Sequence, residues 1–359
     1  MAISQNGGPG DTHLFSSICH CARRHAATQY VGIPQGVPVM CSEPRDRLMS
    51  FCLMMIGGMA LDLLLGWPER LYLRIGHPVT WFGRTIGALE NHLNTGSRGR
   101  RLTAGAITAV LVTLLAALPA VAVQAALPDT WTGVMIGSVL AWPLIASRSL
   151  HEHVVAVARQ LEAHDLPAAR NAVSMIVGRD ASSMDSAAVA RAATESLAEN
   201  TSDGVVAPLF WGAILGLPGI FAYKAINTMD SMIGHRTNRF EAFGKTAARM
   251  DDVANWLPAR MTGITFACLS GRPVRAVGVM LRDASKHRSP NAGWPEGAMA
   301  AALGVRLSGP RMYGGHIAEE PWLNEGAPDL QAGDLGRALS IYRCAVALCG
   351  VVLVGLALL

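Results

Sequence analysis

The sequence predicts an all-α, polytopic integral membrane protein with helical and loop insertions on the cytoplasmic side. Hydrophobic residues make up 51% of the 359 residues and charged residues only 16%. Ordinary soluble domains carry about 25% charged residues, so this chain is poor in the groups that keep a surface hydrated. The apolar residues also gather in long blocks instead of alternating periodically with polar ones. Together these observations favour a membrane domain over two soluble domains.

The first 47 residues are polar, rich in Gly, Pro and His, and without periodicity. We expect residues 1–47 to be a disordered extension, or to precede a true start at Met40 or Met49. The stretch contains no apolar segment followed by a small-residue cleavage site, so it does not read as a signal peptide. We expect residues 48–359 to form a single membrane domain.

The apolar segments of that domain lie near 48–65, 104–127, 133–147, 205–226, 256–269 and 342–359. The second is uncharged and long enough to cross a hydrocarbon core of ~30 Å. Arg98, Arg100 and Arg101 precede it, and Arg148 follows the third segment. By the positive-inside rule these flanks face the cytoplasm, and the intervening turn with Trp131 faces outward. The two segments therefore predict a transmembrane hairpin.

The remaining segments are less regular. Pro218-Gly219 divides 205–226, which predicts either one kinked helix or a re-entrant pair of half-helices; we favour the re-entrant form, which a bilayer tolerates when it is buried in protein. Segment 256–269 is short and contains Arg260, so it is expected to be buried or interfacial. Residues 271–337 are polar and rich in Gly and Pro, and are expected to be mostly loop.

Acidic residues gather just before the divided segment. Glu195 and Glu199 are one helical turn apart, so a helix places both carboxylates on one face, and Asn200 and Asp203 follow. Magnesium takes one or two carboxylates together with phosphate and water, which this group can supply. The alternative is a solvated acidic face next to Arg191.

A second polar cluster follows the divided segment. Lys224, Asn227 and Asp230 recur at every third residue and share a broad helical face, with His235 shortly after. Ionisable groups that emerge from an apolar segment are costly and are usually functional. The alternative is that Lys224 merely extends its charged end to the membrane surface.

The third cluster contains Arg249, Asp251 and Asp252. It suits phosphate and metal binding, or equally a structural ion-pair network. The nearby Gly244-Lys245-Thr246 is not a P-loop, because Arg239 occupies the position of the first glycine and no strand precedes it.

Two loops rich in Pro and Gly complete the inventory. One contains His77, and the other contains Asn291 and Trp294. Such rigid loops suit a large planar ligand, although ordinary turns share the same composition. The net charge of +4 suits an anionic membrane surface. No basic stripe with interleaved aromatics is present, so no nucleic-acid partner is expected.

The ordered motifs of the chain resemble those of the CobD/CbiB family of cobalamin-biosynthesis proteins, also called adenosylcobinamide-phosphate synthases. The resemblance runs in colinear order from Met49 to Leu359. It is carried by His77-Pro78-Val79, Val177-Gly178-Arg179-Asp180, Glu195-Ser196, Glu199-Asn200, Asp203-Gly204-Val205, Tyr223-Lys224-Ala225, Asn227-Thr228, Asp230-Ser231-Met232, Phe243-Gly244, Ala248-Arg249, Asp251-Asp252, Pro258-Ala259-Arg260, Ser289-Pro290-Asn291 and Gly293-Trp294-Pro295.

This resemblance implies an acid–amine ligase of vitamin B12 biosynthesis. It would join (adenosyl)cobyric acid to (R)-1-amino-2-propanol or its phosphate, with ATP and Mg2+ as co-substrate and ion and without a permanently bound cofactor. The resemblance also implies a multi-pass protein of the cell inner membrane whose active site faces the cytoplasm. Its partners would be the corrinoid, the amino alcohol, the lipid bilayer and later membrane enzymes of the pathway.

Residue roles follow as hypotheses. We expect magnesium at Glu195, Glu199, Asp203 and Asp230. We expect phosphates at Lys224, Arg179 and Arg249, and the amine proton to pass to Asp251 or His235. The substrate contacts are expected from His77, Asn227, Asn291 and Trp294.

Two other classes of protein remain as alternatives. A transporter would place its ionisable groups in mid-span at broken helices, whereas these charged motifs lie outside the apolar blocks. A non-catalytic corrinoid-binding scaffold or sensor would bind the corrinoid without turnover that depends on ATP.

Overall fold

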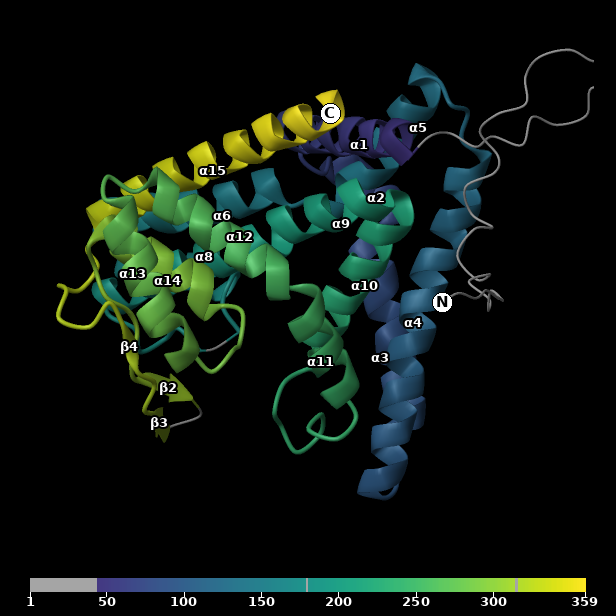
Figure 1. The fold of residues 1–359 in the computed structure, drawn as a ribbon. Coiled ribbons are helices and arrows are strands. Elements are labelled where there is room, and N and C mark those ends of the chain that lie inside the picture. Colours follow the sequence, from purple (N-terminus) through teal and green to yellow (C-terminus); the bar gives the residue numbers. More distant parts are fainter. Residues whose placement is uncertain (1–43, 179, 314–315) are drawn as a thin grey trace, which may run out of the picture. The chain divides into compact units, whose positions relative to one another are not determined.

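The structure, a computed structural model, describes residues 44–178, 180–313 and 316–359 (Figure 1). Most of the expected extension at 1–47 therefore lies outside the described residues. Ser42–Leu359 form one compact unit, and its elements are almost all helical, which confirms the all-α fold class. The first eight helices are α1 (Pro44–Leu65), α2 (Glu69–Ile75), α3 (Pro78–Leu93), α4 (Arg98–Ala126), α5 (Trp131–Ala141), α6 (Ser147–Glu162), α7 (Leu166–Ser174) and α8 (Ser186–Thr201).

A π-helical turn, η2 (Ser202–Val206), joins α8 to the second half of the fold. Its helices are α9 (Ala207–Leu215), α10 (Leu217–Ile233), α11 (Lys245–Ala254), α12 (Trp256–Leu269), α13 (Pro273–Asp283), α14 (Gly293–Leu303) and α15 (Ala332–Leu358). Short 3₁₀ turns span Trp142–Leu144 and Ala284–Lys286. Two small antiparallel pairs complete the fold: β1 (Leu307–Ser308) with β4 (Trp322–Leu323), and β2 (Arg311–Tyr313) with β3 (His316–Ala318).

Four of the described helical segments are long and apolar enough to cross a membrane, which confirms the polytopic membrane class. They are Arg45–Leu65, Arg98–Ala126, Trp131–Glu162 and Ala332–Leu358. On α4, Ile107, Leu115 and Leu118 are each more than half exposed. Apolar side chains in this position need a covering of lipid, because contiguous apolar surface is rarely left in water.

The two segments of the predicted hairpin, α4 and α5, follow each other in the chain but have different packing partners. The main partner of α4 is α10, and that of α5 is α1. The contact between α1 and α5 depends on small residues: a Cβ at Gly57 would overlap the side chain of Ser138, and one at Gly137 would overlap Met54. Such small residues allow membrane helices to approach closely.

The divided segment forms two helices, α9 and α10, which meet at Gly216. Gly216 has φ of 68°, a left-handed value that favours glycine. The side-chain oxygen of Gln124 on α4 accepts a hydrogen bond from the Leu217 amide (2.7 Å). A protein side chain thus satisfies a backbone amide at the break between α9 and α10. The re-entrant path through a membrane remains a prediction.

The expectation that 271–337 is mostly loop is wrong. The helices α13 and α14 occupy much of it, and both pack against α12. Pro273 stands at the start of α13 and Pro295 in the first turn of α14. Backbone amides in the first turn of a helix have no partner within the helix, so the missing N–H of proline costs nothing there. Two of the prolines that suggested loop, Pro273 and Pro295, therefore mark helix starts.

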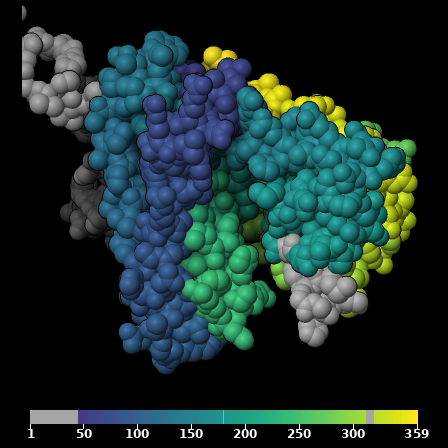
Figure 2. Space-filling model, turned by 180° about the vertical axis from the view of Figure 1, so that it is seen from behind, coloured from purple at the N-terminus to yellow at the C-terminus, as the bar shows by residue number. Residues whose placement is uncertain are grey.

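The helices that carry the polar clusters pack together. The helix α10 contacts α3, α4 and α11, and η2 contacts α12. Figure 2 shows the green segment around the end of α10 against the blue α3 and α4. Motifs that are spread over more than a hundred residues are thereby brought to one region.

Candidate functional site

A cavity of about 720 Å3 lies where α8, η2, α10, α11, α12 and the loop before α14 meet. Its acidic residues come from four of these elements: Glu199 from α8, Asp203 from η2, Asp230 from α10, and Asp251 and Asp252 from α11. Its basic residues are His235, Arg236 and Arg288, and Ser289, Pro290 and Asn291 form part of the wall. This size suits a nucleotide-sized ligand, since ligand pockets measure ~300–1,000 Å3.

The π-helical turn at Ser202–Val206 brings acidic and hydroxyl groups to the cavity. A π-turn inserts one extra residue into a helix, and such turns are frequent at functional sites. Asp203 and Ser202 lie in the turn, and Glu199 lies just before it. The Ser202 hydroxyl is buried and has no hydrogen-bond partner among the described residues. It is therefore available to a bound ligand.

A hydrogen-bond network joins the turn to α10 and α11. The Tyr223 hydroxyl lies 3.0 Å from the Asp203 carbonyl oxygen and 2.9 Å from Asn255 Oδ1. Asn255 donates through Nδ2 to Asp251 Oδ2 (3.0 Å), and Asn227 donates to Asp251 Oδ1 (3.4 Å). The two amides fix the orientation of the Asp251 carboxyl group at the cavity wall.

Burial changes the protonation of these acids. Burial, together with the neighbouring Asp230, raises the pKa of Asp251 to about 7. Burial and the charges of Asp251 and Glu199 raise the pKa of Asp203 well above its usual value. Clustered carboxylates of this kind gain from a bound cation or from a shared proton.

Lys224 is a half-buried cation near these acids. Burial lowers its pKa, while the nearby carboxylates of Asp203 and Asp251 act in the opposite direction. It does not line the cavity, and neither does Asn227. Asn227 donates to Asp251, and Lys224 interacts electrostatically with Asp203 and Asp251, so both act on the site through these carboxylates.

His77 also lies apart from the cavity lining. It caps α3 by accepting the Val79 amide through Nδ1 (3.2 Å), and its ring meets Trp67 edge-on at 4.9 Å between centroids. Burial and the charge of Lys224 lower the pKa of His77 to about 4. The imidazole is therefore neutral at physiological pH.

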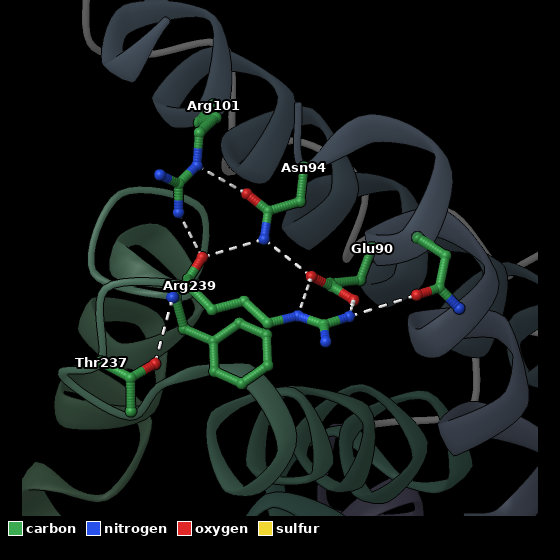
Figure 3. A network of polar contacts seen from close by, with 7 residues as sticks. Glu90, Asn94, Arg101, Thr237 and Arg239 are labelled. Carbon is green, nitrogen blue, oxygen red and sulfur yellow. Dashed lines mark hydrogen bonds and ion pairs between the residues drawn. The ribbon is translucent and has the colours of Figure 1, made fainter. Parts of the chain in front are cut away.

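The loop between α10 and α11, which carries His235 and Arg236, is anchored by a polar network (Figure 3). Arg239 Nε donates to Glu90 Oε1 (2.9 Å) on α3, and the Glu90 carboxylate is almost fully buried. Asn94 donates to Glu90 and to the Arg239 carbonyl oxygen, which also accepts from Arg101. The network joins the cavity wall to α3 and α4.

The part of the wall formed by the loop before α14 is ordered by its own hydrogen bonds. Ser289 accepts the amides of Asn291 (3.3 Å) and Ala292 (3.2 Å) through its hydroxyl. Asn291 Nδ2 donates to the Asp252 carbonyl oxygen (2.8 Å). The Ser-Pro-Asn motif is thus attached to the end of α11.

The structure gathers six of the expected site residues around the cavity: Glu199, Asp203, Asp230, His235, Asp251 and Asn291. Glu195 does not line it; its buried carboxylate accepts the Ser308 amide (2.7 Å) on β1. Arg249 is largely exposed and lies 3.9 Å from Asp252. Trp294 packs on Arg260, and Arg179 lies outside the described residues.

Within the described ranges, no group of three or more His, Cys, Asp or Glu side chains is arranged to hold a metal ion by itself. Mg2+ needs only one or two carboxylates when phosphate and water complete its shell. The carboxylates of Glu199, Asp203, Asp230 and Asp251 fit that partial role, because their mutual repulsion is relieved by a cation.

Sequence reasoning missed Ser202, Arg236 and Arg288, all of which line the cavity. Arg288 directly precedes the Ser-Pro-Asn motif and Arg236 directly follows His235, so proximity to a motif was the available signal. Ser202 likewise directly precedes Asp203, but the π-turn that buries its hydroxyl is not visible in the residue pattern.

Comparison with known proteins identifies the family. The profile of the CobD/Cbib protein family matches residues 55–342. The chain belongs to the CobD/CbiB family. It is 60% identical over 299 residues to the "Cobalamin biosynthesis protein CobD" of Rhodobacter capsulatus, covering 83% of this chain and 95% of that protein.

Other relatives with the same name support the same family. The protein of the same name from Brucella suis biovar 1 is 45% identical over 298 residues (79% of this chain, 89% of that protein). That from Sinorhizobium fredii is 42% identical over 300 residues (81% and 92%). No solved structure matches the chain. Membership of this CobD/CbiB family makes the chain a membrane enzyme of cobalamin biosynthesis.

Proposed function

We propose that this chain catalyses amide-bond formation between the propionate of (adenosyl)cobyric acid and (R)-1-amino-2-propanol or its phosphate, driven by ATP. The observation that carries the proposal is the nucleotide-sized cavity, which combines a cluster of carboxylates with two arginines. One of these carboxyl groups, Asp251, is buried and has a pKa of about 7. Family membership indicates the pathway, and these groups suit the reaction.

The chemistry requires activation of the acid. A carboxylate resists attack by an amine, so we propose that its oxygen first attacks the γ-phosphorus of ATP and releases ADP. The amine nitrogen then attacks the acyl carbon of the resulting acyl phosphate, inorganic phosphate leaves, and the ammonium proton passes to a base. In such a reaction the protein contributes chiefly by positioning reactants and stabilising charge.

Asp251 is the base that the geometry favours. A general base works best when its pKa lies near the working pH, and burial raises that of Asp251 to about 7. Asn227 and Asn255 hold its two oxygens in place at the cavity wall. His235 lines the same cavity and is the second candidate.

The phosphates of ATP would lie between two kinds of group. Arg236 and Arg288, from two different segments of the cavity lining, supply positive charge. Mg2+ arrives with the nucleotide as part of the substrate, and carboxylates such as Glu199 and Asp203 would complete its shell. No permanently bound cofactor is required in this scheme.

We propose that the protein lies in the inner membrane with the cavity facing the cytoplasm. The supporting pattern is Arg98, Arg100 and Arg101 before α4 and Arg148 after α5. An ATP-dependent site also needs access to the cytoplasmic nucleotide pool. Later membrane enzymes of the pathway are the proposed protein partners.

Turnover by purified protein tests the proposal. Detergent-purified protein is incubated with ATP, Mg2+, adenosylcobyric acid and either aminopropanol or its phosphate, and the corrinoid products are analysed by mass spectrometry. We expect a new amide and one ADP per product. Protein that binds the corrinoid but never forms product with either amine would instead support a scaffold or sensor.

A further inference from the structure

An arginine is held between two tryptophans beside the cavity. The guanidinium carbon of Arg260 lies 4.3 Å from the ring centroid of Trp256 and 4.4 Å from that of Trp294. Arg260 also donates to Asn291 Oδ1 (3.3 Å), and Asn291 lines the cavity. The three side chains, called here the Trp–Arg–Trp stack, therefore lie next to the cavity lining.

The position of the stack on α12 separates two different surfaces. Ala259 lines the cavity, whereas Leu257, Met261 and Ile264 form an exposed apolar stripe on another side of the helix. Trp256 stands between them and is 56% exposed. A partly desolvated guanidinium is unfavourable on a lipid-facing surface, because a charge near hydrocarbon is costly. The stack thus suits a polar, aromatic-binding ligand better than lipid.

The size of the cavity leaves part of the substrate outside. About 720 Å3 accommodates a nucleotide and a small amine, but it is too small to enclose a corrin macrocycle as well. The reacting propionate must therefore enter the cavity while the ring rests against its rim. The ring carries methyl groups, amide side chains and the reacting carboxylate around its edge, while the axial ligands of the cobalt, including the adenosyl group, occupy its faces.

We propose that the Trp–Arg–Trp stack is the docking platform for the corrin macrocycle, with Trp256 contacting the ring and Arg260 facing the oxygens at its edge. The inference rests on the proposed function, because the corrinoid is the substrate of that reaction. An exposed indole offers a flat apolar face, and a guanidinium offers planar donors to carbonyl or carboxylate oxygens. The link from Arg260 to Asn291 then couples ring docking to the cavity wall.

The test compares Trp256→Ala with Trp131→Ala in the full-length protein. Trp131 is 72% exposed at the start of α5 and is remote from the stack in sequence and packing. Corrinoid binding is measured without ATP by equilibrium dialysis of adenosylcobyric acid, followed by its visible absorbance. KM values for the corrinoid and for ATP are measured separately, and thermal unfolding reports whether each variant folds.

We expect Trp256→Ala to weaken corrinoid binding and raise the corrinoid KM by about tenfold, the loss typical of one stacked aromatic contact. The KM for ATP should stay unchanged, and Trp131→Ala should match the wild type. Arg260→Lys, which keeps the charge but loses the planar stack, should also weaken corrinoid binding.

Failure of the platform and failure of the ligase reaction are distinguishable. Unchanged dialysis and corrinoid KM in Trp256→Ala, with turnover intact, would overturn the platform and leave the reaction standing. Quenching of Trp256 fluorescence by brominated lipid, together with unchanged corrinoid binding, would assign Trp256 to the bilayer and likewise overturn it. Loss of dialysis binding in Trp256→Ala supports the platform even if no turnover is found.

Discussion

Replacing Asp251 with asparagine should make the protein more stable at high pH while removing activity. Asp251 is buried, and its pKa is about 7 in the folded protein against 3.8 for an unperturbed aspartate. The folded state therefore keeps a proton that the unfolded chain has already lost, so stability falls as pH rises from about 4 to about 7. Above pH 7 both states have lost the proton, so the loss of stability caused by the buried Asp251 carboxylate stays constant.

The size of the effect follows from these two values. At about 1.36 kcal/mol per pH unit, the interval between 3.8 and about 7 corresponds to at most about 4 kcal/mol. Asparagine cannot ionise, so Asp251→Asn avoids the penalty. At roughly 2 °C per kcal/mol, the variant should melt up to ~8 °C above the wild type at pH 8, with a difference that shrinks toward pH 5.

Thermal unfolding in detergent from pH 5 to pH 8 measures the effect. Asp129→Asn is the matched control, because Asp129 is an exposed aspartate in the turn before α5. At pH 8, Mg2+ should raise the melting temperature of the wild type more than that of Asp251→Asn, since a cation relieves the same repulsion. If the melting temperatures of wild type and Asp251→Asn change in parallel with pH, the assignment of a pKa near 7 to Asp251 is refuted.

Three further substitutions test other parts of the site. Lys224→Ala should abolish turnover, because the cation that interacts with Asp203 and Asp251 is lost, while the protein still elutes as a folded species in size-exclusion chromatography. A fully active variant would show that Lys224 does not act on the site. Arg239→Ala should lower kcat/KM by loosening the loop that carries His235, and combining it with Glu90→Gln should add little, since both break one contact; additive losses would contradict the shared role. Ser202→Ala should raise the KM for ATP or amine several-fold with an unchanged melting temperature, as its hydroxyl has no hydrogen-bond partner in the described part of the chain; wild-type kinetics would remove Ser202 from the site.

The membrane class and most helix positions followed from the sequence because apolar blocks are a local signal. The described α1, α4, α12 and α15 each contain an expected apolar segment. Packing partners are not local, however. The predicted hairpin pairs α4 with α5 along the chain, yet α4 packs mainly on α10. The segment after α10 also contacts α4, since Gly105 approaches the Phe243 carbonyl too closely for any Cβ.

The residue types of the site were predictable, but their grouping was not. Glu195 and Glu199 are equivalent in sequence, and only the fold decides that Glu199 reaches the cavity while Glu195 accepts the Ser308 amide. Lys224 was expected to contact phosphate, but it does not line the cavity and interacts electrostatically with Asp203 and Asp251. Such distinctions depend on the π-turn and on contacts with β1, which no residue spacing encodes.

Transfer of isotope from the substrate carboxylate tests the central claim most directly. Adenosylcobyric acid labelled with 18O in the reacting carboxylate is incubated with the protein, ATP, Mg2+ and the amine, and the products are analysed by mass spectrometry. The proposed reaction predicts one 18O in the inorganic phosphate for each amide formed, because that oxygen bonds to the γ-phosphorus and leaves with it. Labelled AMP, or no amide that depends on ATP, would contradict it.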